Sequence, residues 1–189
     1  MITIETRRLL IRNFGSDDAD SLREMIVQKE SSPYAVYDHE WPTSENEIKG
    51  IVAWFASQDH YLAVGLKETG KLIGFISLNP AGSEESIEFD IGYCLNSDYH
   101  NHGYATEGCQ AVIDFAFQEL KAASLTSGTA AHNGPSCRLL NRLGLKKISE
   151  GTTSFRKTPE GKPIEFVGWG FALSKEDWLD SQAEPGCKK

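Results

Sequence analysis

The residues best suited to chemistry form a short polar run, His100 to Thr106, in which Gly103 stands where a strand pattern gives way to a helix pattern. A strand that turns through glycine into a helix leaves several backbone N–H groups without an intrahelical partner. The helix dipole adds partial positive charge at the same place. Together these features predict an anion site, best suited to phosphate.

Two regular elements must position these N–H groups. Ile87, Phe89, Ile91 and Tyr93 recur at every second position, which predicts a half-buried strand. The following helix carries two apolar stripes: Val112, Phe115, Ala116 and Ile113, Phe117, Leu120. Neither G-x-x-x-x-G-K-[ST] nor G-x-G-x-x-G follows this strand, so the common nucleotide loops are not indicated.

The run HNHGYATE resembles the R/Q-x-x-G-x-G/A pyrophosphate loop of the GNAT acetyltransferase superfamily, and GYATE resembles its Rim-type branch, the ribosomal-protein N-terminal (alanine/serine) acetyltransferases. His100 stands where the family has Arg or Gln, but backbone sets the loop, so binding should survive. The resemblance implies acetyl-CoA as cosubstrate. It also implies three groups of cofactor-binding residues. Leu95, Asn96 and Ser97 would pair with the pantetheine arm. The pyrophosphate would be bound by His100, Asn101, His102, Gly103, Tyr104, Ala105 and Thr106, and the cofactor would also contact Asn133 and Ser136.

Two further signatures extend this likeness over nearly the whole chain. TRRLLIRNF followed by DDAD resembles the opening of the Rim-type branch, T-x-R-L-x-L-R then D-A. Asn133 to Leu145 resembles the family's N-x-x-S-x-x-x-x-x-x-x-G-F signature, with Leu145 in place of Phe. Three motifs in the right order are far more specific than any one of them.

Acetyl transfer to an amine would require a neutral amine, and the chain offers three carboxylates to take its proton. The pKa is about 8 for an α-amino group and about 10.4 for lysine, so a protein N-terminus needs less help from a base. Asp90 lies where the family often has Glu in E-I-G-Y, Glu88 shares its strand face, and Glu165 lies on a hairpin that borders the acceptor cleft in the family. Each is also compatible with a plain solvated strand residue.

The departing thiolate needs a proton, and the thioester oxygen needs a hydrogen-bond donor. The resemblance implies that Ser136 donates to the sulfur and that Asn133 contacts the cofactor, although both residue types also cap helices. A backbone amide near Leu95 is the candidate donor to the oxyanion.

An aromatic segment, residues 31–42, is expected to form part of the acceptor wall. Tyr34, Tyr37 and Trp41 are its candidate substrate-binding residues, with simple loop packing as the alternative. Helices are predicted on either side, from Ser16–Asp20 to about Lys29 and from Glu45 to about Ser57.

The remaining elements complete a mixed α/β GNAT fold: a twisted, mostly antiparallel sheet of about six to seven strands, with helices on both faces and a splayed central strand pair. The other predicted strands span 2–14, 61–66, 72–78, 125–130, 146–155 and 164–172. Short helices are expected after His132–Pro135 and around Trp178. Residues 1–181 are predicted to form a single domain, and residues 182–189 a disordered tail.

Composition limits the remaining function classes. A net charge of −8 without a basic stripe disfavours nucleic acid, and it suits either a cationic acceptor or plain solubility. The N-terminus does not resemble a signal peptide and no apolar run reaches about 20 residues, so no membrane role and a cytoplasmic location are expected. The family's members are often homodimers, and nothing in the sequence decides this.

Cysteine and histidine chemistry is not favoured. Cys94, Cys109, Cys137 and Cys187 show no C-x-x-C spacing, so free thiols are expected. Covalent catalysis by Cys137 lacks a visible histidine partner, and the histidines lack the carboxylate or thiol partners of a metal site, so no metal is expected. The predicted function is acetyl transfer to a primary amine, in particular a protein N-terminus. The alternatives are a small amine acceptor such as an aminoglycoside or polyamine, and a non-catalytic acyl-CoA-binding module.

Overall fold

A computed structural model describes residues 2–82 and 86–183 of the 189-residue chain. Its strands are β1 Thr3–Glu5, β2 Leu9–Asn13, β3 Tyr61–Leu66, β4 Leu72–Pro80, β5 Glu88–Leu95, β6 Ser124–Ala130, β7 Lys146–Thr153 and β8 Phe166–Ser174. Its α-helices are α1 Ala19–Glu30, α2 Glu45–Ala56, α3 Tyr104–Gln118, α4 Gly134–Arg142 and α5 Lys175–Ala183. Short 3-10 turns occupy Ser16–Asp18, Ala35–Tyr37 and Ser97–Tyr99.

The strands form one eight-stranded sheet in the order β1-β2-β3-β4-β5-β6-β8-β7. Neighbouring strands are antiparallel except for β5 and β6, which run parallel and are joined through α3. The predicted mixed α/β fold with a mostly antiparallel sheet is confirmed. The strand count exceeds the predicted six to seven, because residues 2–14 fold as a hairpin of two strands instead of one strand.

The break between β1 and β2 has a local cause. The Thr6 hydroxyl accepts a hydrogen bond from Leu9 N at 2.9 Å, and Thr6 N donates to Leu9 O at 3.0 Å. Such side-chain bonds to nearby backbone offer the chain a turn in place of a continued strand. The turn presents Thr6 and Arg8 to the start of α3.

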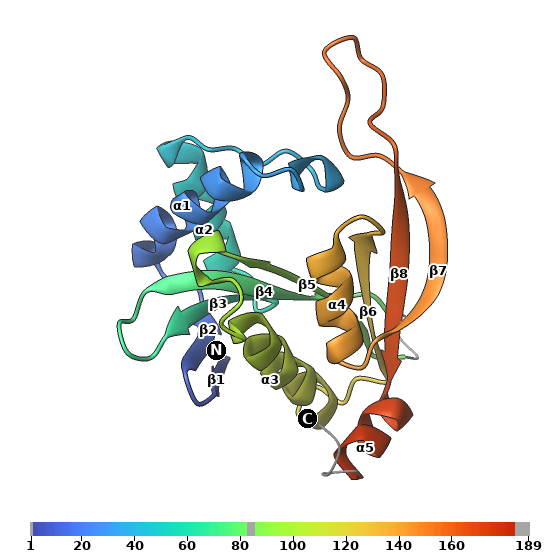
Figure 1. Cartoon of the computed structure of the whole chain (residues 1–189). Coiled ribbons are helices and arrows are strands. Elements are labelled where there is room, and N and C mark those ends of the chain that lie inside the picture. The colour runs from blue at the N-terminus through green and yellow to red at the C-terminus, as the bar shows by residue number, and fades with distance from the viewer. Residues whose placement is uncertain (1, 83–85, 184–189) are drawn as a thin grey trace.

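The helices cover both faces of the sheet, as Figure 1 shows for α1 and α2 on one side and α3 and α4 on the other. Period-2 alternation divides the strand side chains between two cores. Ile76 and Ile91 pack with α3 and α4, whereas Ala63 and Phe75 pack with α1 and α2. In the described part of the chain, no helix is long and apolar enough to cross a membrane.

The central strands β5 and β6 separate along their length. Their pairing holds for Glu88–Ser124, Phe89–Leu125 and Asp90–Thr126, and both strands then continue without further paired positions. The predicted splayed pair is therefore present, with its apex at Asp90 and Thr126. The gap opens toward the end of β5, where the chain turns into α3.

Two expected boundaries differ at the C-terminal end. The last hairpin has its second strand at Phe166–Ser174 instead of 164–172, because Ile164 N bonds Arg156 O within the loop. Gln182 and Ala183, expected in a disordered tail, still belong to α5, and residues 184–189 lie outside the described residues.

Candidate active site

The loop between β5 and α3 takes an unusual backbone path. Asn101 and Gly103 have φ of 62° and 81°, the left-handed region that glycine and asparagine tolerate best. Between described residues, no hydrogen bond is donated by the backbone N–H of any residue from 101 to 106. These open donors stand at the N-terminus of a 15-residue helix, where the dipole adds positive charge. The geometry is suited to an anion, as the sequence predicts.

Side chains engage two carbonyl groups of the same loop and the carbonyl of Leu95 at the end of β5. The His100 ring Nε2 lies 3.0 Å from Leu95 O, and the His102 ring Nδ1 lies 2.7 Å from His100 O. Arg8 Nη1 donates to His102 O at 2.9 Å. At the first turn of α3, Thr106 Oγ1 accepts a hydrogen bond from Arg142 at 3.1 Å, and Tyr104 lies 4.3 Å beneath the Arg8 guanidinium. Side chains thus engage these three carbonyls and leave the N–H groups of residues 101–106 open.

The backbone of β5 offers hydrogen bonds to the gap beside β6. Asn96 N donates to Ile73 O at 2.9 Å, which makes these two residues a hydrogen-bonded pair. Alternation in an antiparallel ladder then turns the backbone groups of Leu95 and Tyr93 away from β4, toward β6. Ser97 N is also engaged, with Gln28 Oε1 at 2.9 Å. Of the residues expected along the pantetheine, Leu95 directs its N–H toward the gap while its carbonyl is engaged by the His100 ring, and Asn96 and Ser97 donate their N–H groups elsewhere.

The three candidate carboxylates have different surroundings. Asp90 is half-buried at the apex of the gap, and its Oδ2 accepts a hydrogen bond from Thr126 Oγ1 at 3.2 Å. Burial raises the pKa of Asp90, against the opposing effect of that hydrogen bond. Glu88 lies two residues earlier on β5, and its carboxylate accepts a hydrogen bond from Ser86 Oγ. Glu165 is exposed just before β8. Asp90 combines partial burial and a raised pKa with a place where the strands diverge.

Ser136 lies in the first turn of α4, with its hydroxyl facing β5. Asn133 caps this helix, since its Oδ1 accepts from Ser136 N at 3.3 Å. Ser136 Oγ lies 2.8 Å from the Tyr93 hydroxyl, which reaches it from β5. Burial raises the pKa of Tyr93 strongly, so its hydroxyl stays protonated. Tyr93 was missed from sequence, because the alternating pattern that places it on the face of Ile91 is equally typical of a core residue.

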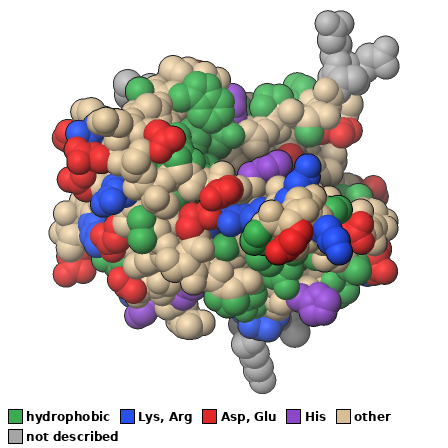
Figure 2. Space-filling model, turned by 90° about the horizontal axis from the view of Figure 1, so that it is seen from above, with side chains coloured by type: hydrophobic (Ala, Val, Ile, Leu, Met, Phe, Trp, Pro, Cys, Tyr) green, Lys and Arg blue, Asp and Glu red, His purple; other side chains and the backbone are tan. Residues whose placement is uncertain are grey.

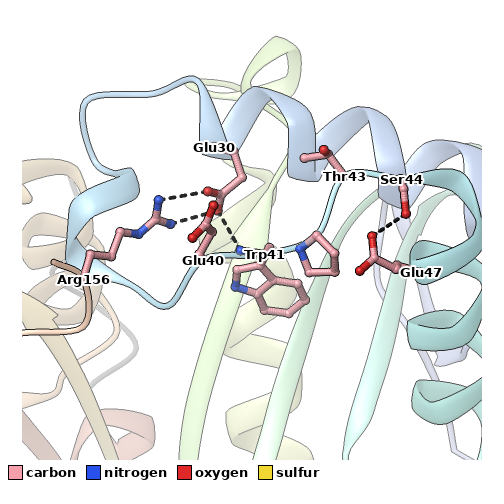
Figure 3. A pocket seen from close by; sticks show the side chains of 8 residues that line it. Glu30, Glu40, Trp41, Thr43, Ser44, Glu47 and Arg156 are labelled. Atoms are coloured by element: carbon pink, nitrogen blue, oxygen red, sulfur yellow. Dashed lines mark hydrogen bonds and ion pairs between the residues drawn. The ribbon is translucent and has the colours of Figure 1, made fainter. Parts of the chain in front are cut away.

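The aromatic segment lies over the opposite face from α4. Tyr34 is exposed, and Tyr37 packs against Phe166 with ring centroids 5.1 Å apart. Trp41 packs on Phe75 at 5.9 Å and lines an open groove of about 750 Å³. Figure 3 shows this groove, whose wall also contains Glu30, Glu40, Pro42, Thr43, Ser44, Glu47 and Arg156. The predicted aromatics are therefore divided between packing, a groove wall and the surface.

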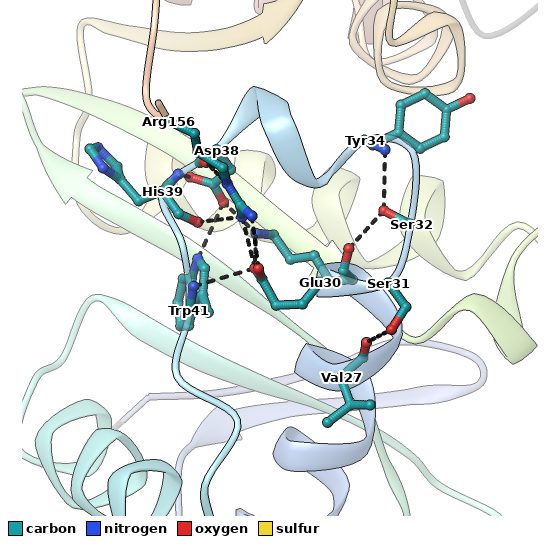
Figure 4. Close-up of polar contacts among 10 residues, drawn as sticks. Val27, Glu30, Ser31, Ser32, Tyr34, Asp38, His39, Trp41 and Arg156 are labelled. Atoms are coloured by element: carbon teal, nitrogen blue, oxygen red, sulfur yellow. Dashed lines mark hydrogen bonds and ion pairs between the residues drawn. The ribbon is translucent and has the colours of Figure 1, made fainter. Parts of the chain in front are cut away.

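Arg156 ties the loop between β7 and β8 to this segment (Figure 4). Its guanidinium bonds Glu30 at 2.9 Å, Asp38 O at 2.8 Å and His39 O at 3.0 Å. Burial acts to raise the pKa of Glu30, but Arg156 and Lys29 outweigh it, and the net pKa is lowered. Viewed from above, the face that carries both segments is hollowed near its middle, with hydrophobic and His side chains at the rim (Figure 2).

The described cysteines lack the character of nucleophiles. Burial raises the pKa of Cys94 and of Cys109 to about 12, and it also raises that of Cys137. Thiolates are the reactive form, so covalent transfer through these thiols is not supported. Cys187 lies outside the described residues. Within residues 2–82 and 86–183, no group of three His, Cys, Asp or Glu side chains is placed to hold a metal ion.

Comparison with known proteins agrees with this geometry. The model of the acetyltransferase (GNAT) domain matches residues 8–146. The uncharacterized N-acetyltransferase YnaD of Bacillus subtilis is 29% identical over 93% of this chain and 98% of its own length. YdaF of Bacillus subtilis, provisionally named a ribosomal N-acetyltransferase, is 25% identical over 90% of this chain and 93% of its own. A GNAT-family acetyltransferase structure from Bacillus anthracis superposes with a TM-score of 0.78, at 25% identity, over 93% of this chain and 99% of that one. The chain therefore belongs to the GNAT family of acetyltransferases, enzymes that take their acetyl group from acetyl-CoA.

Proposed function

We propose that this protein transfers the acetyl group of acetyl-CoA to the α-amino group of a protein N-terminus. The observation that carries the proposal is the pairing of an open β5–β6 gap with a loop of uncommitted N–H groups at its wide end. A diphosphate at residues 101–106 and an amide-bearing arm beside Tyr93 and Leu95 would occupy both features at once.

The reaction joins the amine nitrogen to the thioester carbon and breaks the carbon–sulfur bond. One proton leaves the amine and one proton is taken up by the thiolate. Asp90 is the proposed acceptor of the first, because burial raises its pKa and brings it closer to that of an amine. Ser136 is the proposed donor of the second, with its hydroxyl facing β5.

Strand geometry favours the N–H of Tyr93 over that of Leu95 as the hydrogen-bond donor to the oxyanion. Asp90 and Leu95 are separated by about 16 Å along an extended strand, so the two cannot serve one carbonyl. The Tyr93 N–H faces the same gap and lies closer to the apex, at about 10 Å from Asp90 along the strand. We assign the oxyanion contact to Tyr93 N–H and a bridging water to Asp90.

The acceptor class rests on charge. The groove beside Trp41 is lined by Glu30, Glu40 and Glu47 against a single described cation, Arg156, which Glu30 already pairs. A cationic acceptor is favoured by such a wall and by the net charge of −8. The provisional name of YdaF, a ribosomal N-acetyltransferase, also favours a protein acceptor.

Calorimetry with acetyl-CoA, followed by thiol release on a peptide array and an amine panel, tests the proposal. We expect micromolar to submillimolar binding and turnover on peptides with free N-termini. Turnover on polyamines or aminoglycosides alone would mean that the acceptor is a small amine instead of a protein N-terminus. Binding without thiol release on any acceptor would indicate a non-catalytic module, and no binding at millimolar ligand would end the proposal.

A further inference from the structure

We propose that Arg8 and Glu107 are positioning residues for the diphosphate loop: they hold the His102 carbonyl outward and thereby direct the Gly103 N–H into the site. The inference rests on the proposed function, because it concerns how the same loop binds acetyl-CoA. Arg8 belongs to the turn between β1 and β2, far from the loop in sequence and in contact with it in the fold.

The contacts form one connected network. Glu107 Oε1 accepts from Arg8 N at 2.8 Å and from Thr6 Oγ1 at 2.6 Å, and its Oε2 accepts from Arg8 Nε at 2.7 Å. Glu107 stands in the first turn of α3, so the network fixes the guanidinium relative to the helix start. The same guanidinium then donates to His102 O at 2.9 Å. Burial acts to raise the pKa of Glu107, but these bonds outweigh it and lower the net pKa, so the pair stays charged.

Peptide geometry converts this carbonyl contact into a direction for an N–H group. The C=O of His102 and the N–H of Gly103 belong to one planar trans peptide and point in opposite directions. A guanidinium on the carbonyl side therefore turns the N–H to the far side. His102 Nδ1 acts in the same way on His100 O, which orients the N–H of Asn101. Both oriented N–H groups belong to the two left-handed residues, Asn101 and Gly103.

The side chain at position 100 does not perform this task itself. The His100 ring turns back to Leu95 O, so it braces the end of β5. Arg8 supplies the cation beside the loop instead. The fit is close, because a Cβ at Gly103 would lie 3.4 Å from Arg8 Nη2.

The chain offers a matched control in Arg12. It lies on β2, four residues from Arg8, and its guanidinium pairs with Asp18 at 2.8 Å and with Asn13 O at 3.0 Å. This ion pair has similar geometry but ties β2 to the turn before α1. Arg12→Gln therefore removes a comparable ion pair without touching the loop.

The experiment compares Arg8→Gln, Arg8→Lys, Glu107→Gln and Arg12→Gln for two substrates, acetyl-CoA and the truncated thioester S-acetyl-pantetheine, which lacks the diphosphate. For Arg8→Gln we expect acetyl-CoA affinity to fall about 10- to 100-fold with kcat retained at saturation, and kcat/KM for the truncated thioester to stay within about 2-fold of wild type. The acetyl-CoA affinity of Arg8→Lys should lie between those of wild type and Arg8→Gln, since lysine keeps the charge but not the forked donors of arginine. Arg12→Gln should lower the melting temperature without changing acetyl-CoA affinity.

Three outcomes would overturn the inference. The first is wild-type acetyl-CoA affinity in both Arg8 variants. The second is an equal loss for both substrates, which would indicate a general loss of folding. The third is unchanged or tighter binding in Glu107→Gln, which would mean that Arg8 contacts the diphosphate directly and is restrained by Glu107. Failure of wild-type protein to bind acetyl-CoA would be a different result, since it would remove the proposed function itself.

Discussion

The two walls of the candidate site are constructed differently. The proposed cofactor wall consists of consecutive residues, from β5 through the 97–103 turn into α3, and the groups it offers are open backbone N–H groups. The acceptor wall is assembled from segments far apart in sequence, residues 31–44 and the β7–β8 loop, joined by side chains such as Arg156 and Glu30. The first wall is a property of the fold, whereas the second depends on individual side chains. Substitutions on the two walls should therefore change different kinetic constants.

The largest expected effect lies at Asp90, the proposed base at the apex of the β5–β6 gap. Asp90→Asn should lower kcat/KM about 100-fold or more, as for loss of a general base, while acetyl-CoA affinity is kept. Because burial raises the pKa of Asp90, wild-type kcat/KM should increase with pH through a range above the ordinary value of 3.8, and the variant should lose this acidic limb. Initial rates of thiol release over pH measure both. Glu88→Gln is the control, and an equal loss there would remove the assignment of Asp90 as base.

The second effect concerns Tyr93 on the cofactor wall and Ser136, which faces it from α4. Tyr93→Phe and Ser136→Ala should each lower kcat about 10-fold, with little change in the KM of the acceptor. The two hydroxyls are 2.8 Å apart, so the double variant should lose much less than the product of the single losses. Multiplicative losses in this double-mutant cycle would show that the two side chains act independently.

The third effect should be confined to the acceptor wall. Arg156→Gln removes the ion pair with Glu30 and the bonds to Asp38 O and His39 O, so the aromatic segment loses its tie to the β7–β8 loop. We expect the KM of the acceptor peptide to rise about 3- to 10-fold and the calorimetric affinity for acetyl-CoA to stay constant. Lys157→Gln, one residue along the same loop, is the control. If acetyl-CoA affinity fell as much as acceptor affinity in Arg156→Gln, the two walls would not act separately.

The smallest effect is on stability and tests the same tie. Arg156 and Lys29 lower the pKa of Glu30 against the effect of burial. A carboxylate with a depressed folded-state pKa stabilises the fold above its ordinary pKa, here 4.5, and this stabilisation is lost as pH falls through the folded-state value. Glu30→Gln should therefore lower the melting temperature by a few degrees at pH 7, and the difference should shrink as pH falls below 4.5. A constant difference across pH would contradict the role of the charge.

Much of the fold followed from local patterns, and the exceptions have physical causes. Helical spacing located α2 and α3 to within a residue or two, because each buries one regular face. The Gly-bearing hairpin loop located β3, whose central residues are buried on both faces of the sheet. The β1–β2 break was missed because it depends on one hydroxyl, that of Thr6, bonding Leu9. The β5–β6 gap came from the family resemblance, since no residue spacing states where two strands diverge.

The site residues divide along the same line. The loop at Gly103 was visible because a left-handed turn and a helix start have sequence signals. The Tyr93–Ser136 and Arg8–His102 contacts were not visible, because each joins residues at least 43 positions apart. For Asp90, Glu88 and Glu165, the sequence offered the set, and the fold favours Asp90 because it lies where β5 and β6 diverge.

The link made by Arg156 has a consequence for transplanting specificity between relatives. Exchange of residues 31–44 alone would place a foreign backbone against the guanidinium in place of the Asp38 and His39 carbonyls. Exchange of the β7–β8 loop alone would remove Arg156 from half-buried Glu30 and leave Lys29, at 3.5 Å, as its described cationic partner. The two segments should therefore be exchanged as one unit. Moved together, they should transfer the acceptor preference; moved singly, they should yield a chimera that still binds acetyl-CoA but has low acetyltransferase activity.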